Sequence, residues 1–237
     1  MSDDHYYIAG YSAEDDPYSE ANGVLKNKLG ITNTKDLNEV EAELAALAVQ
    51  ELLQRKPPAE YSVDSLQAIH REIFQEIYPW AGEFRKVDIA KGDTYFEKHQ
   101  DIAGKLNSLF EDCKSKDYFK GLPAEELAQE SANFLIQLNL IHPFREGNGR
   151  SQRLLLSQMA LNAGYKIEWS GVSDSAMKKA CVDGVEGNST TMKKMLKLYL
   201  EPIPPEPQVE PKASVMENKD KLREKYLVGK KSHKKEP

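Results

Sequence analysis

The stretch LIQLNLIHPFREGNGRSQRLLL, from Leu135 to Leu156, decides how this chain is organised. Two apolar runs flank a charged segment that is punctuated by glycines. Apolar residues at helical spacing predict a helix on each side, over Pro123–Ile141 and Gly149–Asn162. Core packing does not explain a polar segment between two apolar helices, so we look for a chemical function of these residues.

Helical patterns recur on both sides of this stretch, and they make the predicted fold mainly α. A small hairpin is expected within Pro79–Phe96, where Phe84, Val87 and Ile89 alternate with polar residues before a turn at Gly92-Asp93. The other helices are predicted over Leu37–Leu53, Ser62–Tyr78, Gln100–Cys113, Ser173–Val185 and Thr190–Leu200.

Composition limits the domain count to one main folded unit. The chain has 237 residues, of which 40% are hydrophobic, enough for one sizeable core. We expect an N-terminal extension over 1–36 and the folded domain over 37–200. Residues 201–237 are first proline-rich and then lysine-rich, which predicts a linker and a mostly disordered basic tail.

Several classes of protein are disfavoured by the same sequence. No apolar run approaches the roughly 20 residues that cross a bilayer, and the first residues do not resemble a signal peptide, so we expect a cytoplasmic protein without a membrane partner. Cys113 and Cys181 lie far apart, which indicates neither a disulfide framework nor a thiolate metal site. A net charge of −6 argues against a function that relies on broad neutralisation of nucleic-acid phosphates.

The polar interruption supplies parts that suit phosphoryl or nucleotidyl transfer. His142 can be neutral at physiological pH and accept a proton from a hydroxyl. Glu146 offers a hard oxygen ligand for Mg2+. Gly147 allows a turn whose N–H groups face an anion at the start of a helix, where the helix dipole is positive. Arg150 and Arg153 share a helix face and can hold further phosphate oxygens.

Each of these residues alone has an ordinary structural explanation. A lone His is more often a helix-terminal or core residue, an Arg pair is usually a solvated face, and Gly-Asn-Gly is usually a turn. Phe144 is expected to be a core anchor in either case. Their fixed order within a dozen positions favours the functional interpretation.

The ordered string from His142 to Arg150, followed by Arg153, resembles the Fic family signature HPFx(D/E)GNGRxxR at every specified position. The resemblance covers roughly 37–200 and implies a Fic-type helical bundle that transfers AMP from ATP to a Ser, Thr or Tyr hydroxyl of a target protein. It implies that His142 is the base and that Glu146 holds Mg2+. It also implies that Gly147, Asn148 and Gly149 cradle phosphates, with Arg150 and Arg153 on the leaving pyrophosphate.

The same resemblance makes the hairpin a flap that docks the target by main-chain pairing. Val87, Asp88 and Ile89 are then the expected docking edge, and Lys91 and Gly92 are expected to approach the nucleotide. A plain structural hairpin is the alternative.

Some alternatives stay open within the family. Kinase-like relatives carry Lys where this chain has Gly149, so the glycine favours AMP transfer, but transfer of another phosphate-containing group and a nucleotide-dependent binding module are not excluded. The internal inhibitory pattern (S/T)xxxE(G/N) is absent. We therefore expect either a separate small antitoxin that places a Glu opposite Arg153 or an unregulated enzyme, such as an effector secreted into a host cell.

Overall fold

The computed structural model describes residues 7–8, 16–92 and 94–204. The α-helices in this part of the chain are α1 (Thr34–Gln54), α2 (Val63–Phe74), α3 (Ile102–Ser115), α4 (Ala124–Ile141), α5 (Asn148–Asn162), α6 (Asp174–Val185) and α7 (Thr190–Tyr199). Short strands are β1 (Tyr7–Ile8), β2 (Ile89–Lys91), β3 (Thr94–Tyr95), β4 (Tyr165–Ile167) and β5 (Leu200–Pro202), and 3-10 turns lie at Asp117–Phe119 and Trp169–Gly171. The expected mainly helical fold is confirmed.

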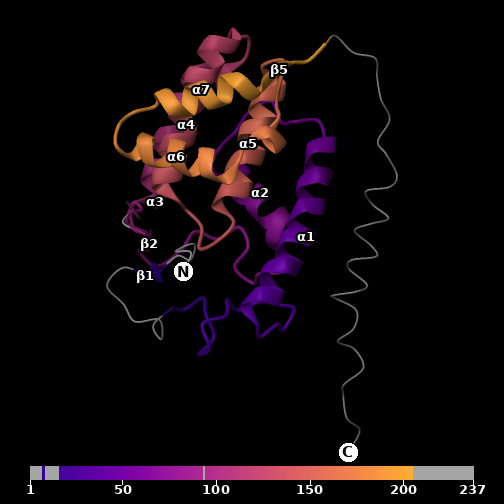
Figure 1. Cartoon of the computed structure of the whole chain (residues 1–237), viewed down its shortest axis with the longest axis vertical. Coiled ribbons are helices and arrows are strands. Elements are labelled where there is room, and N and C mark those ends of the chain that lie inside the picture. The colour runs from indigo at the N-terminus through magenta and orange to yellow at the C-terminus, as the bar shows by residue number, and fades with distance from the viewer. Residues whose placement is uncertain (1–6, 9–15, 93, 205–237) are drawn as a thin grey trace, which may run out of the picture.

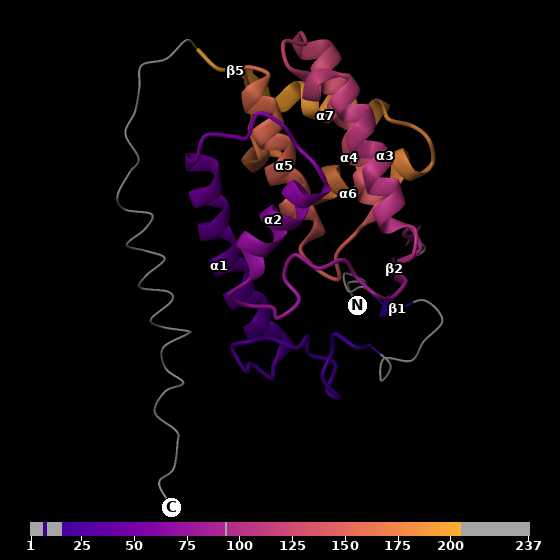
Figure 2. The ribbon, with the colours of Figure 1, turned by 180° about the vertical axis from the view of Figure 1, so that it is seen from behind.

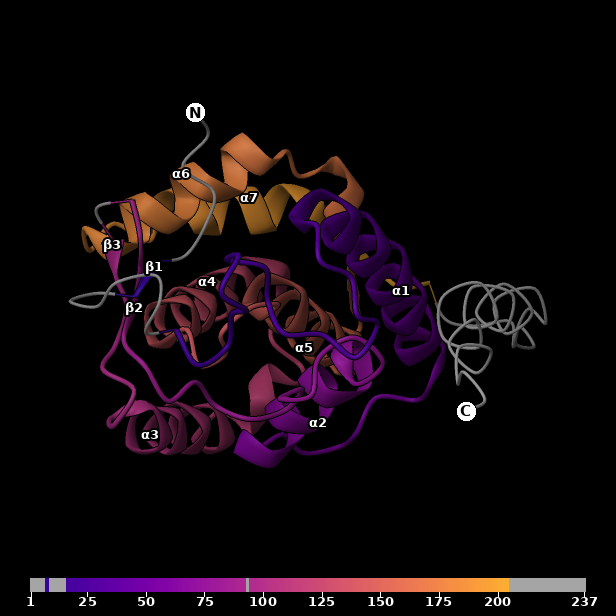
Figure 3. The same cartoon turned by 90° about the horizontal axis from the view of Figure 1, so that it is seen from below.

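Helices α4 and α5 lie at the centre of the bundle, and the other helices surround them (Figure 3). Helices α6 and α7 pack on α4 from one side and α3 packs on it from another, while α1 and α2 pack beside α5 (Figures 1 and 2). Both α4 and α5 bury many apolar residues, as the fully buried Leu138 and Leu155 illustrate. The loop that joins these two helices, 142–147, is therefore held at both ends by well-buried helices.

Helix α2 is shorter than the sequence predicts. It ends at Phe74 rather than Tyr78, and the chain continues as a turn in which the N–H groups of Ile77 and Tyr78 both donate to the carbonyl of Phe74. Pro79 disfavours helical backbone in the residue before it. Ile77 and Tyr78 are nevertheless buried, so their apolar pattern reflects packing and not helix.

The strand content also differs from the expectation. The predicted hairpin is present as β2 and β3, but β1 pairs with β2 on its other side, which gives a three-stranded antiparallel sheet in the order β1-β2-β3. A second pair, β4 with β5, was not predicted. Since β5 covers 200–202, folded structure continues past the expected boundary at residue 200.

The segment before α1 belongs to the core, although it was expected to be an extension. Tyr18, Val24 and Leu29 are buried in the same hydrophobic cluster as the helices. Most of the expected basic tail, 205–237, lies outside the described residues. Among the described helices, none has the length and apolar character needed to span a membrane.

Candidate active site

His142 lies directly after α4 and adopts a left-handed backbone conformation, with φ 47° and ψ 62°. Its N–H closes the helix by donating to the carbonyl of Leu138. The ring nitrogen Nδ1 is 3.1 Å from the carbonyl oxygen of Asn139. Because a carbonyl can only accept, Nδ1 carries the proton in the neutral ring, and Nε2 carries the lone pair.

The surroundings of His142 keep its imidazole neutral. The side chain is buried, and the ring of Phe96 stacks on it with centroids 3.8 Å apart. Burial lowers the pKa of His142 to about 3, and the charges of Arg85 and Lys91 act in the same direction, whereas the Asn139 carbonyl opposes them. A neutral ring with its lone pair on Nε2 is the state that a general base requires.

Gly147 begins the turn into α5 and no other residue fits there. Its φ is +80°, and a Cβ at this position would lie 2.2 Å from Cε2 of Phe74. No side chain caps α5. Within the described part of the chain, the N–H groups of Asn148, Gly149 and Arg150 have no hydrogen-bond acceptor. The start of α5 therefore presents three N–H donors at the positive end of a helix dipole, an arrangement that binds anions.

The Asn148 side chain, for which a phosphate contact was expected, bonds to the backbone of Phe144. Its Oδ1 accepts from the N–H of Phe144 at 2.9 Å, and its Nδ2 donates to the carbonyl of Phe144 at 2.7 Å. Asn148 thus closes the loop with both polar atoms of its side chain, and its backbone N–H has no acceptor among the described residues. Phe144 is completely buried and stacks on His70, with centroids 3.8 Å apart, a position that suits an anchor of the loop.

His70 of α2 links the motif to the segment before the flap, a contact that local sequence patterns do not predict. Its Nδ1 accepts from the N–H of Gly82 at 2.8 Å, so Nε2 is the donor to the carbonyl of Glu146, 2.9 Å away. Burial lowers its pKa to about 3. Like His142, this ring is held neutral, but both of its nitrogens are used structurally.

Glu146 has one carboxylate oxygen engaged and one accessible. Oε1 accepts from the N–H of Gly147 at 2.9 Å and lies 3.5 Å from Nη2 of Arg150. Oε2 makes no hydrogen bond to a described residue, and it is not among the buried atoms that lack a partner. Burial and the nearby charge of Glu41 raise the pKa of Glu146, while Arg150 opposes the rise.

The arginines of the motif differ in their partners. Arg145 pairs with Asp16 at 2.8 Å, and Arg150 pairs with Glu41 at 2.5 Å. For the Arg153 guanidinium, no hydrogen bond or ion pair is present among the described residues, and its Nη1 would lie 3.2 Å from a Cβ on Gly149. Arg153 is therefore an unpaired cation beside the first turn of α5.

The buried Arg85 connects the end of α4 to the flap. Its guanidinium donates to the carbonyls of Ile141, His142, Val87 and Glu97, and its N–H donates to the carbonyl of Pro143. These bonds link the segment just before β2, which is not in a strand, to the end of α4.

The expected docking edge, residues 87–89, is only partly available for pairing with a target. Asp88 Oδ1 accepts from the N–H of His99 at 2.7 Å and lies 2.8 Å from its Nδ1. Ile89 is opposite Ile8 in the pairing of β1 with β2, so this side of the flap is covered by the chain's own β1. Lys91 and Gly92 lie at the tip of the hairpin, and the charge of Lys91 reaches His142.

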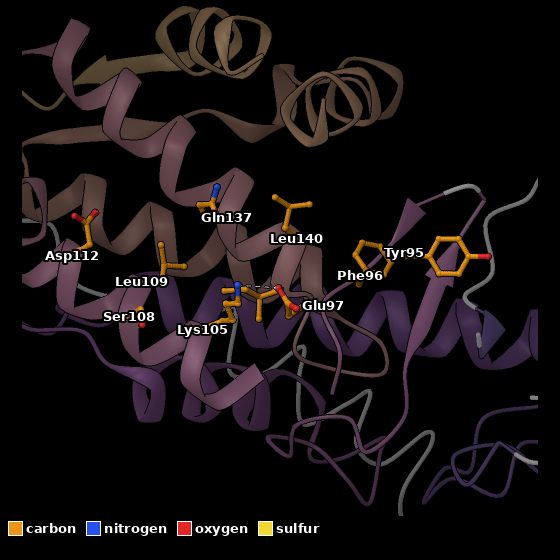
Figure 4. Close-up of a pocket in the computed structure, with 10 residues that line it drawn as sticks. Tyr95, Phe96, Glu97, Lys105, Ser108, Leu109, Asp112, Gln137 and Leu140 are labelled. Carbon is orange, nitrogen blue, oxygen red and sulfur yellow. Dashed lines mark ion pairs between the residues drawn. The ribbon is translucent and has the colours of Figure 1, made fainter. Parts of the chain in front are cut away.

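A groove of about 520 Å³ opens beside the flap, between β3, α3 and α4. Figure 4 shows Tyr95 pointing outward from β3, and Glu97 beside Lys105, with which it forms an ion pair at 3.6 Å. Phe96 joins the groove to the catalytic loop because its ring also stacks on His142. The lining residues are Tyr95, Phe96, Glu97, Lys105, Ser108, Leu109, Asp112, Gln137, Leu140 and Ile141.

Comparison with known proteins identifies the family of this chain. Residues 60–160 match the model of the Fic/DOC family. The chain is 34% identical over 179 residues to the probable protein adenylyltransferase Fic of Salmonella typhimurium, covering 75% of this chain and 88% of that protein. The chain belongs to the Fic/DOC family.

Two further relatives extend the comparison of this Fic domain. The protein adenylyltransferase VbhT of Bartonella schoenbuchensis is 33% identical over 191 residues, but the match covers 80% of this chain and only 40% of VbhT. The crystal structure of BepC, a VirB-translocated effector of Bartonella tribocorum with bound AMPPNP, superposes with a TM-score of 0.73. It is 26% identical, and the match covers 78% of this chain and 96% of BepC.

Proposed function

We propose that this Fic domain is a protein adenylyltransferase, which moves AMP from ATP to a hydroxyl of a target protein and releases pyrophosphate. The observation that carries the proposal is a neutral His142, with its lone pair on Nε2, one short loop away from an uncapped helix start. The names of the relatives agree, since both curated proteins compared above are called adenylyltransferases.

His142 is the base in this reaction. Nε2 accepts the proton of the target hydroxyl. The hydroxyl oxygen attacks the α-phosphorus of ATP, and the bond between the α-phosphorus and pyrophosphate breaks. The Nδ1–H bond to Asn139 keeps the ring in the required tautomer, and the stacked Phe96 fixes its plane. Such a transfer depends mainly on alignment and on stabilising charge at the phosphates.

The phosphates are bound by the start of α5. The N–H groups of 148–150 and the guanidinium of Arg153 are donors without protein partners in the described part of the chain. Arg153 is suited to the pyrophosphate, whose negative charge increases as the bond to AMP breaks. AMPPNP bound to BepC is consistent with a nucleotide in this fold.

Glu146 is the protein ligand for Mg2+ in this proposal. The described residues contain no cluster of three or more His, Cys, Asp or Glu side chains that would form a metal site by themselves. One accessible carboxylate oxygen next to a phosphate site nevertheless fits Mg2+, which commonly takes one or two carboxylates together with substrate phosphates. When bound, the ion would neutralise phosphate charge.

The experiment incubates the purified protein with a bacterial or host lysate and with ATP labelled at the α- or the γ-phosphate. We expect α-label on protein, no γ-label, and loss of the α-label in His142→Ala. Protein labelled from the γ-phosphate would indicate a kinase and overturn the proposal. Nucleotide binding without transfer to any protein would favour a binding module.

The unpaired Arg153 also suggests how the enzyme is controlled. A carboxylate from a separate small antitoxin would form an ion pair with this guanidinium and compete with the phosphates of ATP. Delivery into a host cell is the other form of the proposal, and the translocated relative BepC favours it. If the wild-type chain is harmless when expressed alone in its host while the purified enzyme is active, the antitoxin version loses support.

A further inference from the structure

Glu41 of α1 reaches the signature loop from a distant part of the sequence. Its side chain is 9% exposed, and its Oε1 accepts from Nη2 of Arg150 at 2.5 Å. Its other oxygen accepts from the hydroxyl of Tyr78. Both oxygens of Glu41 are therefore engaged, and the carboxylate is fixed in place.

Arg150 is shared between two carboxylates. The same nitrogen, Nη2, lies 2.5 Å from Glu41 and 3.5 Å from Oε1 of Glu146. The guanidinium also lies over the ring of Phe74, 4.7 Å from its centroid. The distances show that Glu41 is the stronger partner, since a separation of 3.5 Å is at the limit of a hydrogen bond.

This division matters because Glu146, in the loop, and Arg150, in the first turn of α5, are already in contact, so the Arg150 guanidinium could turn further towards Glu146. A guanidinium that formed a bidentate pair with Glu146 would take both carboxylate oxygens. Oε2 of Glu146 would then no longer be accessible to a cation. Glu41 opposes this arrangement, because it takes the same nitrogen of Arg150, Nη2, at the shorter distance.

We propose that Glu41 is a positioning residue for the metal site: it holds the guanidinium of Arg150 so that Glu146 keeps an oxygen for a divalent cation. The inference rests on the proposed role of Glu146 in the nucleotide site. In this role α1 does more than pack against the other helices. Loss of Glu41 should therefore reduce the effect of Mg2+ on nucleotide affinity, in addition to any effect on stability.

The test measures how strongly Mg2+ improves nucleotide binding. Affinity for AMPPNP is determined by calorimetry in EDTA and at saturating Mg2+, and the ratio of the two dissociation constants is the metal enhancement. In Glu41→Gln we expect this enhancement to fall about ten-fold, the scale seen when groups that orient metal ligands are removed. Glu72→Gln is the matched control, because Glu72 pairs with Arg55 outside the site and its side chain is 38% exposed.

A second measurement, in the Arg150→Met variant, separates positioning of Arg150 by Glu41 from a general structural effect of losing Glu41. Arg150→Met removes the guanidinium that Glu41 restrains, so adding Glu41→Gln to it should leave the enhancement unchanged within about two-fold. A ten-fold fall in that background would show that Glu41 does not act through Arg150 and would overturn the inference. If Glu41→Gln does not fold, Tyr78→Phe keeps both charges, frees one oxygen of Glu41 and should lower the enhancement by a smaller factor.

The outcomes distinguish this inference from the proposed function. An enhancement that is lost in Glu41→Gln supports the inference even if no protein in the lysate accepts AMP. Wild-type transfer of AMP together with an enhancement that is equal in wild type and Glu41→Gln overturns the inference and leaves the proposed function intact. Absence of any enhancement in the wild type overturns it as well, because Glu146 then holds no cation.

Discussion

Gly147 meets two requirements at the turn between the base and α5. The backbone conformation at φ +80° disfavours any residue with a Cβ, and the place where a Cβ would lie is occupied by the ring of Phe74. Gly149, two residues later, lies inside the helix. A Cβ there would approach only the mobile end of Arg153, at 3.2 Å. The two glycines of the motif therefore serve different purposes.

Gly147→Ala should lower the free energy of unfolding by about 2–5 kcal/mol, the sum of a left-handed conformation and an overpacked contact. Urea unfolding of the purified variant measures this. Gly149→Ala is the matched comparison, and because helical glycine is itself costly we expect its stability to be equal to or up to about 1 kcal/mol above that of the wild type. A larger loss at Gly149 than at Gly147 would contradict this account of the turn.

At the scale of elements, the flap and α4 are joined through one buried side chain. Arg85 places its donors on carbonyls from the end of α4 and from the strand region, and burial lowers its pKa to about 10, so it remains charged. Carbonyls at a helix C-terminus carry partial negative charge, which a buried guanidinium stabilises. The orientation of His142 thus depends on a residue in the flap segment.

Arg85→Lys keeps the charge but cannot reach all these carbonyls from one ammonium group. Each buried acceptor left without a donor costs about 1–3 kcal/mol, so we expect a loss of at least about 3 kcal/mol in urea unfolding and a fall in kcat for AMP transfer. Lys86→Ala is the control, because the Lys86–Glu83 pair is exposed on both sides and should matter by less than about 0.5 kcal/mol. Equal stability of the two variants would show that the Arg85 hydrogen bonds contribute little.

The pairing of β1 with β2 makes a prediction about target binding. If targets dock on the flap by main-chain pairing, β1 occupies part of the edge they need. Removing residues 2–8 should raise the initial rate of α-label transfer to lysate proteins and leave AMPPNP affinity unchanged. Removing residues 2–5 keeps Tyr7–Ile8 and should leave the rate as in the wild type. A rate that falls in the longer deletion would mean that β1 supports the flap and does not compete for it.

Features that depend on residues close together in the sequence could be predicted, and features that depend on distant residues could not. The helices, the signature loop and the anchor Phe144 depend on neighbouring residues, so local spacing was sufficient. Asp16, Glu41 and Arg85 reach the loop across 129, 109 and 57 residues, and a single sequence carries no signal for such pairs. The same holds for β1, β4 and β5, which are too short to show a strand period and exist because a partner lies beside them.

At the scale of the whole molecule, the N-terminal third supplies carboxylates to a cationic loop. Asp16 pairs with Arg145, and Glu41 pairs with Arg150. Both pairs are largely removed from solvent, so each stabilises the fold only while both partners are present. Arg153 is the one motif arginine that has no such pair within the described residues. Its guanidinium can therefore bind a phosphate or a carboxylate of another protein.

The two buried histidines make the whole domain sensitive to acid. The pKa of His70 and of His142 is about 3 in the folded chain, against an ordinary value of 6.5. Between these values the unfolded chain binds a proton at each ring and the folded chain does not. Stability from each ring is therefore complete above pH 6.5 and is lost as the pH falls towards 3, by about 1.4 kcal/mol per pH unit for one proton.

His142→Asn removes one of these titrations with little change to the backbone, because Asn tolerates the left-handed conformation and its amide can donate to the Asn139 carbonyl. Urea unfolding at pH 6.0, 5.0 and 4.5 should show stability falling less steeply in the variant, by about 1.4 kcal/mol per pH unit, because carboxylate titrations are common to both proteins and cancel in the difference. Parallel curves would mean that His142 takes up its proton in the folded state near its ordinary pKa. The ring would then be partly protonated at mildly acid pH, and the acid limb of the transfer rate would lie near pH 6.5 and not well below it.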